Sequence, residues 1–177
     1  ENKSIKEVFP ELSLYVYGGV SYDPYKSTFD KLFGKKVDTL ATFPASEGFF
    51  GYQDTFTDEN TDLLLILNND IFYEFIKAED FLKGEYERIT LKDVQVNVNY
   101  LLIISTSAGL WGYNIGDTVK FTSIRPYRII VSGRIKHFLS AFGEHVIAEE
   151  VENSMKIATK DHGVTCLLYT SDAADDP

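Results

Sequence analysis

The sequence predicts an α/β fold in which a β-α-β unit is followed by a region of short strands. Residues 12–17 are apolar and β-prone and run into Gly18-Gly19, and residues 37–42 form a second strand-like run. Between them, residues 23–34 have helical spacing, with a proline near the start and a glycine at the end. This order is typical of two parallel strands joined by a crossover helix, and such sheets bind ligands at the carboxyl ends of their strands.

The middle of the sequence changes to short β-type segments. Asn68-Asn69-Asp70 predicts a hairpin link between the first two of them. Residues 94–99 alternate valine with a polar residue, which indicates a strand with one wet face, whereas residues 100–104 have no polar face and should be central. We therefore expect a compact antiparallel or barrel-like β unit appended to the β-α-β piece. Its predicted strands cover residues 62–67, 71–76, 94–104, 118–121 and 128–131.

The C-terminal part returns to a helical period. From Glu144 onward, Ile147, Val151, Met155 and Ala158 fall on one helix face. One helix beyond the last strand cannot complete a domain, so a second domain is expected to start near residue 133. Residues 166–177 do not continue this pattern, and we expect them not to be native.

Composition excludes several classes of protein. The formal net charge is -10, with 27 acidic and 17 basic side chains, which argues against a nucleic-acid or anionic-membrane surface. The chain lacks the roughly 18 consecutive apolar residues that a membrane helix needs. Cys166 is the single cysteine, so no internal disulfide or zinc-ligand spacing is expected, and a reducing, cytoplasmic compartment fits. The sequence starts at Glu1 without Met or a signal-peptide pattern, and we expect its true N-terminus to be missing.

Two carboxylates stand where ligand chemistry is expected. Glu47 follows Ser46 in the segment after the second predicted strand, and a carboxylate there can supply a hard oxygen ligand for Mg²⁺. Asp117 follows Gly116 and can accept hydrogen bonds from both hydroxyls of a ribose. The alternative for both is a turn carboxylate that bonds its own backbone. Gly18 would allow backbone to approach a ligand closely, or would only form a turn.

The glycine-rich phosphate loops of nucleotide enzymes are not found in this sequence. Neither G-x-x-x-x-G-K-[ST] nor G-x-G-x-x-G occurs. Aromatic residues make up 14% of the chain, and they suit a sugar or acyl pocket as well as ordinary core packing.

Four ordered stretches together resemble one family, the auxin-responsive Gretchen Hagen three family of acyl acid amido synthetases in the adenylate-forming superfamily. The resemblance covers roughly residues 8–160. The stretches are GGVSYDPY, TFPASEGFF, GLWGYNIGDTVKF and PYRIIVSGRIKHFLSAFGEHV. The resemblance implies an ATP-dependent ligase that converts a carboxylic acid to an acyl adenylate and then joins it to an amino acid amine. Small-molecule acids and amino acids would be its partners, and ATP and Mg²⁺ its cofactors.

The resemblance also implies roles for residues near the second predicted strand. Glu47 matches the motif glutamate near Mg²⁺ and phosphate, and Ser46 matches the hydroxyl beside it. Phe43 occupies an aromatic position for adenine stacking where the family usually has tyrosine. Gly18 and Gly19 match backbone on the adenine and acyl side.

The later motifs are implied to complete the site. Asp117 matches the ribose-binding aspartate of a Tyr-Arg-x-Gly-Asp motif, but Asn114 stands in the place of the arginine. Arg134 and Lys136 belong to a hinge-like segment, with Arg134 able to reach ribose and Lys136 counted as catalytic; the alternative for both is a solvated surface charge.

By this resemblance, residues 1–132 form the C-terminal part of the large nucleotide- and acyl-binding domain, and residues 133–165 start a small C-terminal α/β lid domain. The phosphate loop and most of the lid would lie outside the sequence, so these residues alone are not expected to make an adenylate. Three alternatives stay open. They are an acyl-CoA-forming relative, a glycoside hydrolase with two carboxylates in an aromatic cleft, and a non-catalytic binding module.

Overall fold

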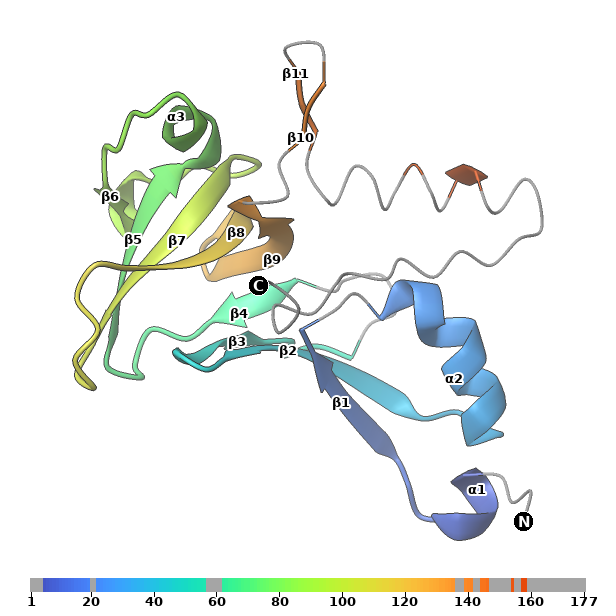
Figure 1. Ribbon diagram of the computed structural model, residues 1–177. Coiled ribbons are helices and arrows are strands. Elements are labelled where there is room, and N and C mark those ends of the chain that lie inside the picture. Colours follow the sequence, from blue (N-terminus) through green and yellow to red (C-terminus); the bar gives the residue numbers. More distant parts are fainter. Residues whose placement is uncertain are drawn as a thin grey trace, which may run out of the picture.

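In this computed structural model, the described part of the chain forms one open sheet of nine strands with short helices on it (Figure 1). The described residues are 5–19, 22–56, 62–135, 139–141, 144–146, 154 and 157–158. The strands of the sheet are β1 (Leu14–Gly18), β2 (Asp38–Ala45), β3 (Gly48–Tyr52), β4 (Leu63–Leu65), β5 (Ile71–Lys77), β6 (Ile89–Thr90), β7 (Asn99–Thr106), β8 (Tyr113–Ile124) and β9 (Tyr127–Arg134). The helices are α1 (Ile5–Val8), η1 (Asp23–Tyr25), α2 (Lys26–Phe33), α3 (Ala78–Leu82) and η2 (Leu91–Asp93).

The predicted β-α-β unit is confirmed. Strands β1 and β2 pair in parallel, and η1 and α2 form the connection between them. The helix ends because Gly34 adopts a left-handed conformation with φ 63°, and its N–H bonds the carbonyl of Asp30. On the side of β1 that faces α2, the ring of Tyr15 stacks on Phe29 with centroids 5.2 Å apart. This aromatic contact fixes the helix on the sheet.

Strand β2 continues past its predicted end and turns back into β3. Pro44 has no N–H to donate, and it is tolerated because β1 has already ended opposite Thr42. A register shift between Phe43 and Pro44 marks a β-bulge at this point. The segment that follows the second predicted strand is therefore part of a hairpin.

The rest of the sheet is antiparallel and open. Its strand order is β1-β2-β3-β4-β9-β8-β7-β5-β6, so among the described residues β1 and β6 are the outermost strands and the sheet does not close into a barrel. Residues 100–104 are buried at the centre of β7, as predicted. The rings of Phe75 and Phe121 meet edge to face at 5.2 Å in the core beside them. Each such buried side chain contributes about 1.5–3 kcal/mol relative to an exposed one.

Two predictions about strand partners and boundaries are wrong. Strand β4 pairs with β3 and β9, and β5 pairs with β7 and β6, so residues 68–70 do not join a hairpin. Instead, the amide of Asn69 donates to the carbonyl of Phe49 over 2.8 Å and holds this connection against β3. Residues 94–98 lie outside β7 as well, because Asn97 has φ 65°, which interrupts an extended strand.

The end of the main sheet crosses the predicted domain boundary at residue 133. Strand β9 continues to Arg134, and Ile135 packs against the small cluster of Ile76, Leu101 and Ile103. Residues 144–146 form β11 (Glu144–Val146), which pairs with β10 (Leu139–Ala141), so the predicted helix does not begin at Glu144. The larger part of that predicted helix lies outside the described residues.

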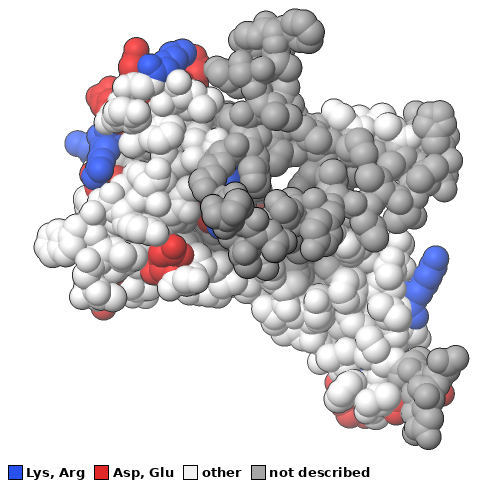
Figure 2. All heavy atoms as spheres, in the orientation of Figure 1, with Lys and Arg blue, Asp and Glu red and all other residues white. Residues whose placement is uncertain are grey.

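Charged side chains are unevenly distributed over the face drawn in Figure 2. Acidic and basic groups gather together around α3, where Lys83 forms an ion pair with Glu79. Fewer charged side chains lie lower in the view, over β1 to β3. None of the helices in the described part of the chain has both the length and the apolar character required to cross a bilayer.

Candidate functional site

Glu47 lies in a two-residue turn between β2 and β3. Ala45 and Gly48 pair with each other across the hairpin, so Ser46 and Glu47 form its tip. A Cβ on Gly48 would stand 2.8 Å from Cδ1 of Ile71, so a larger residue there would require the Ile71 side chain to move. Ser46 is exposed and Glu47 is partly buried. The carboxylate is therefore carried by a short, rigid turn.

Asp117 lies within β8, at a point where the sheet is irregular on both sides. Toward β7, Ile103 is opposite Asn114 and Leu101 is opposite Thr118, so β8 carries extra residues over this interval. Toward β9, the register shifts again between Thr118 and Val119. Bulges of this kind redirect side chains and are common beside active sites. Here they place Asp117 at 8% exposure within the sheet.

Three influences set the ionisation of Asp117. Burial has the largest effect and raises the pKa of its carboxyl group. Arg134 opposes this change, because its Nε donates to Oδ1 of Asp117 over 2.9 Å and its positive charge favours the carboxylate. The negative charge of Glu47 raises the pKa further, and the net direction is upward. Glu47 and Asp117 therefore lie close enough in space to interact electrostatically.

A buried hydroxyl pair supports the irregular segment next to Asp117. Ser132 on β9 donates from Oγ to Oγ1 of Thr118 on β8 over 3.1 Å. Both residues are buried, so neither hydroxyl can be satisfied by bulk water. This bond ties the two strands together beside the position where their register shifts.

Gly18 and Gly19 are each glycine for a different structural reason. A Cβ on Gly18 would lie 2.7 Å from Cδ of Pro44 and 2.8 Å from the carbonyl oxygen of Thr42, so only glycine fits in this place. Gly19 has open space around its Cα but adopts φ 86°, which favours glycine for backbone reasons. Gly18 thus lies beside the strand that leads into the turn of Glu47.

The remaining predicted site residues do not all join this group. Phe43 is 6% exposed, and its ring packs edge to face on Phe50 with centroids 5.0 Å apart, which places it in the core. Arg134 joins Asp117 directly, as described above. Lys136 lies outside the described residues. The structure therefore pairs Asp117 with Arg134, while Phe43 lies in the core and the charge of Glu47 acts on Asp117.

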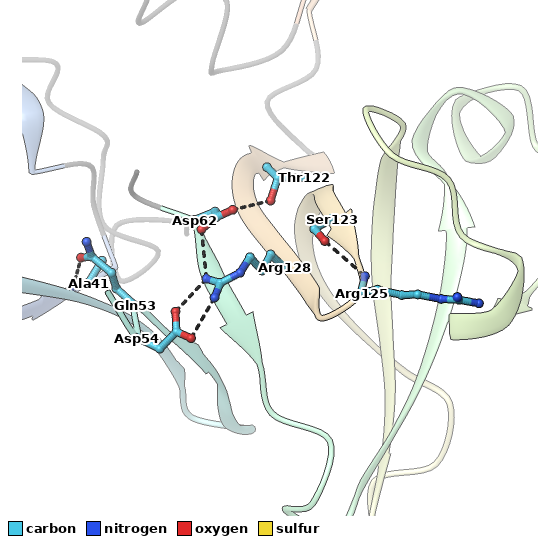
Figure 3. Close-up of polar contacts among 8 residues, drawn as sticks. All are labelled: Ala41, Gln53, Asp54, Asp62, Thr122, Ser123, Arg125 and Arg128. Carbon is cyan, nitrogen blue, oxygen red and sulfur yellow. Dashed lines mark hydrogen bonds and ion pairs between the residues drawn. The ribbon is translucent and has the colours of Figure 1, made fainter. Parts of the chain in front are cut away.

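An ionic cluster that the sequence did not predict joins β9 to the segments beside β3 and β4 (Figure 3). Arg128 on β9 donates to both carboxylate oxygens of Asp54 over 2.7 and 2.8 Å, and to Asp62 over 3.3 Å. Thr122 donates to the other oxygen of Asp62 over 2.7 Å. Asp54 follows β3 and Asp62 precedes β4, so Arg128 secures the connection between these strands at both ends. Sequence spacing alone offers no signal for this cluster.

Neither Glu47 nor Asp117 lines either of two pockets in the described part of the chain. One pocket, of about 410 Å³, is lined by residues of α2, by Tyr17 of β1 and by Lys36, which lies between α2 and β2. The other, of about 620 Å³, is an open hollow whose lining includes Phe72 and Trp111. Among the described residues, no group of three or more His, Cys, Asp or Glu side chains is arranged to hold a metal ion.

The fold and the site together define the class of protein. The protein has an open mixed sheet, and a bulged strand of this sheet carries an aspartate. This aspartate is paired with an arginine and is close to a second carboxylate. Comparison with known proteins shows which family the chain is similar to. Residues 64–134 match the GH3 family central domain, a span that contains Asp117 and Arg134 but not Glu47. The resemblance to the Gretchen Hagen three family that the sequence predicted is confirmed.

Two plant proteins are among the similar curated sequences. The chain is 29% identical over 143 residues to "Probable indole-3-acetic acid-amido synthetase GH3.11" of Oryza sativa subsp. japonica, covering 73% of this chain and 24% of that protein. It is 30% identical over 125 residues to "Jasmonoyl--L-amino acid synthetase JAR4" of Nicotiana attenuata, covering 66% of this chain and 21% of that protein. The chain thus spans about a quarter or less of the length of these relatives.

A solved structure shares the fold. The structure named GH3.15 acyl acid amido synthetase superposes with a TM-score of 0.68 at 18% identity, covering 88% of this chain and 28% of that one. The predicted α/β fold class is therefore confirmed, with an open sheet.

Proposed function

We propose that this protein is an ATP-dependent ligase that activates a carboxylic acid as an acyl adenylate and transfers the acyl group to the amine of an amino acid. The observation that carries the proposal is the buried carboxylate of Asp117, which lies on a bulged strand, is bonded by Arg134 and responds to the charge of Glu47 from a distant part of the sequence. The similarity to proteins named as amido synthetases supplies the reaction class.

The chemistry explains why such a site needs both carboxylates. A carboxylic acid is anionic at neutral pH, is a poor acceptor of nucleophiles, and is repelled by the triphosphate of ATP. The enzyme must hold the two reactants in line and neutralise charge at the phosphate. In this proposal Asp117 accepts hydrogen bonds from the ribose hydroxyls and so fixes the nucleotide, while Arg134 either supports Asp117 or contacts the ribose itself.

Glu47 would hold Mg²⁺ in this site. Its carboxylate is a hard oxygen donor on a rigid turn, and Mg²⁺ is commonly bound by one or two carboxylates together with substrate phosphates. When bound, the ion would offset negative charge on the phosphate oxygens. Ser46, exposed beside Glu47, would donate its hydroxyl to a phosphate oxygen.

The remaining assignments follow the family resemblance. Gly18 and Gly19 would line the adenine and acyl side, and the ring of Phe43 would stack on adenine. Lys136 would assist catalysis from the segment that follows Arg134, in a lid domain that starts there. A soluble, cytoplasmic enzyme acting on small molecules is consistent with these roles.

The test uses the full-length protein with ATP, Mg²⁺ and a panel of carboxylic acids. We expect acid-dependent release of pyrophosphate, and an amide product by mass spectrometry when amino acids are added. If the product were a thioester of coenzyme A and not an amide, the adenylation step of the proposal would stand and the acceptor would be coenzyme A. Absence of acid-dependent pyrophosphate with the whole panel would contradict the proposal.

A further inference from the structure

We propose that Asn114 is a positioning residue that sets the direction of Asp117 by bonding the backbone of Gly116. The amide oxygen of Asn114 accepts a hydrogen bond from the N–H of Gly116 over 2.8 Å. The bond closes a local turn within β8, one residue before Asp117. The inference rests on the proposed function, because it concerns how Asp117 is presented to a nucleotide.

The register of the sheet shows why the turn needs support. Ile103 of β7 is opposite Asn114 of β8, and Leu101 of β7 is opposite Thr118 of β8. Residues 115–117 of β8 therefore cannot all take part in a regular ladder of hydrogen bonds with β7. A bulge leaves backbone groups without their usual cross-strand partners, and those groups need another partner. The side chain of Asn114 supplies one, in the way that asparagine side chains commonly cap turns.

The conformation of Gly116 fits the same explanation. Gly116 has φ 81°, and a Cβ built on it would contact nothing within 4 Å. Steric crowding is therefore not the reason for a glycine at this position. The reason is the left-handed backbone conformation, which glycine adopts more readily than other residues. Because Asp117 follows directly, this backbone conformation decides where its carboxylate points, and that carboxylate reaches Arg134 at 2.9 Å.

Asn114 itself is exposed. Replacing Asn114 with alanine removes the acceptor and leaves the strand sequence otherwise intact. The lost bond contributes about 0.5–1.5 kcal/mol, which corresponds to roughly a two- to tenfold change in an equilibrium constant. We therefore expect Asn114→Ala to raise KM for ATP roughly two- to tenfold, with little change in kcat or in KM for the acid.

The same strand offers a matched control at its other end. Ser123 accepts from the N–H of Arg125 over 3.2 Å, which is also a side-chain bond to the backbone two residues on (Figure 3). Ser123→Ala should leave KM for ATP unchanged. Asn114→Ser should restore part of the affinity because its hydroxyl can accept the same bond more weakly. Gly116→Ala disturbs the turn by a second route and should raise KM for ATP as Asn114→Ala does.

The experiment measures steady-state kinetics of adenylation by the full-length protein, with melting temperatures to confirm folding. A rise in KM for ATP in Asn114→Ala and Gly116→Ala, partial rescue in Asn114→Ser and no change in Ser123→Ala would support the inference. If Asp117→Ala raised KM for ATP while Asn114→Ala and Gly116→Ala did not, the inference would be wrong and the proposed function would stand. If Asp117→Ala also left KM for ATP unchanged, the proposed function would fail, and the inference with it.

Discussion

The negative charge of Glu47, in the turn between β2 and β3, raises the pKa of Asp117 on β8. A direct prediction follows for the variant Glu47→Gln, which keeps the shape of the side chain and removes its charge. The pKa of Asp117 should fall, because one of the influences that disfavour its ionised form is gone. Carboxyl-carbon NMR titration of Asp117 measures the change. Glu74→Gln, on β5, is the matched control and should leave the pKa of Asp117 unchanged.

Asp117 should also reduce the stability of the fold at neutral pH. Burial raises its pKa above the unfolded value, so the folded protein binds this proton more tightly than the unfolded chain does. The stabilising contribution is complete below the unfolded pKa of about 3.9 and is lost as pH rises through the higher folded pKa. Asp117→Asn, which does not ionise, should therefore melt at a higher temperature than wild type at pH 7. The difference should disappear toward pH 3, and a lower melting temperature for Asp117→Asn at pH 7 would refute this explanation.

Gly18 and Gly19 should respond differently to alanine. In Gly18→Ala the new Cβ would meet Pro44 at 2.7 Å and the backbone of Thr42 at 2.8 Å, so β1 and β2 must separate. Overpacking of this kind costs about 1–3 kcal/mol. Gly19→Ala meets no neighbouring atom and should cost only the backbone strain of its φ of 86°, about 1 kcal/mol. Urea unfolding compares the two, and an equal or smaller loss for Gly18→Ala would count against this packing.

Arg128 should matter for stability more than its place at a sheet surface suggests. Arg128→Ala would leave Asp62, which is 7% exposed, without the guanidinium that bonds it. We expect a loss of about 2 kcal/mol, below the roughly 3–5 kcal/mol of a fully buried pair because Asp54 is partly exposed. Arg88→Ala, which breaks a longer 3.4 Å pair with Glu74, should cost at most about 1 kcal/mol. Equal losses in chemical denaturation would show that the Arg128 cluster adds no specific stability.

The local elements of this fold could be predicted because local chemistry determines them. Gly34 ends α2 with a left-handed residue, and the apolar run 100–104 is buried within β7. Strand partners could not be predicted in this way. Residues 68–70 have the composition of a hairpin turn, but β4 and β5 bury their faces beside other strands, and the pairing depends on contacts between segments far apart in the sequence.

The candidate site shows the same division. Glu47 and Asp117 could be selected from motif spacing, and the charge of Glu47 raises the pKa of Asp117. The bulges on both sides of Asp117 and the bond from Gly116 to Asn114 could not be selected, because they follow from the register of β7, β8 and β9. The cluster around Arg128 was missed for the same reason, since its partners lie 74 and 66 positions away in the sequence.

The central claim is that Asp117 binds the nucleotide of an adenylation reaction. The most direct measurement is acid-dependent exchange between pyrophosphate and ATP by the full-length protein, with wild type, Asp117→Ala and the control Ser123→Ala. A charge-assisted hydrogen bond contributes about 1.5–3 kcal/mol, so we expect Asp117→Ala to lower kcat/KM for ATP roughly 10- to 150-fold with every acid tested. Ser123→Ala should match wild type. Wild-type kinetics for ATP in Asp117→Ala would contradict the account.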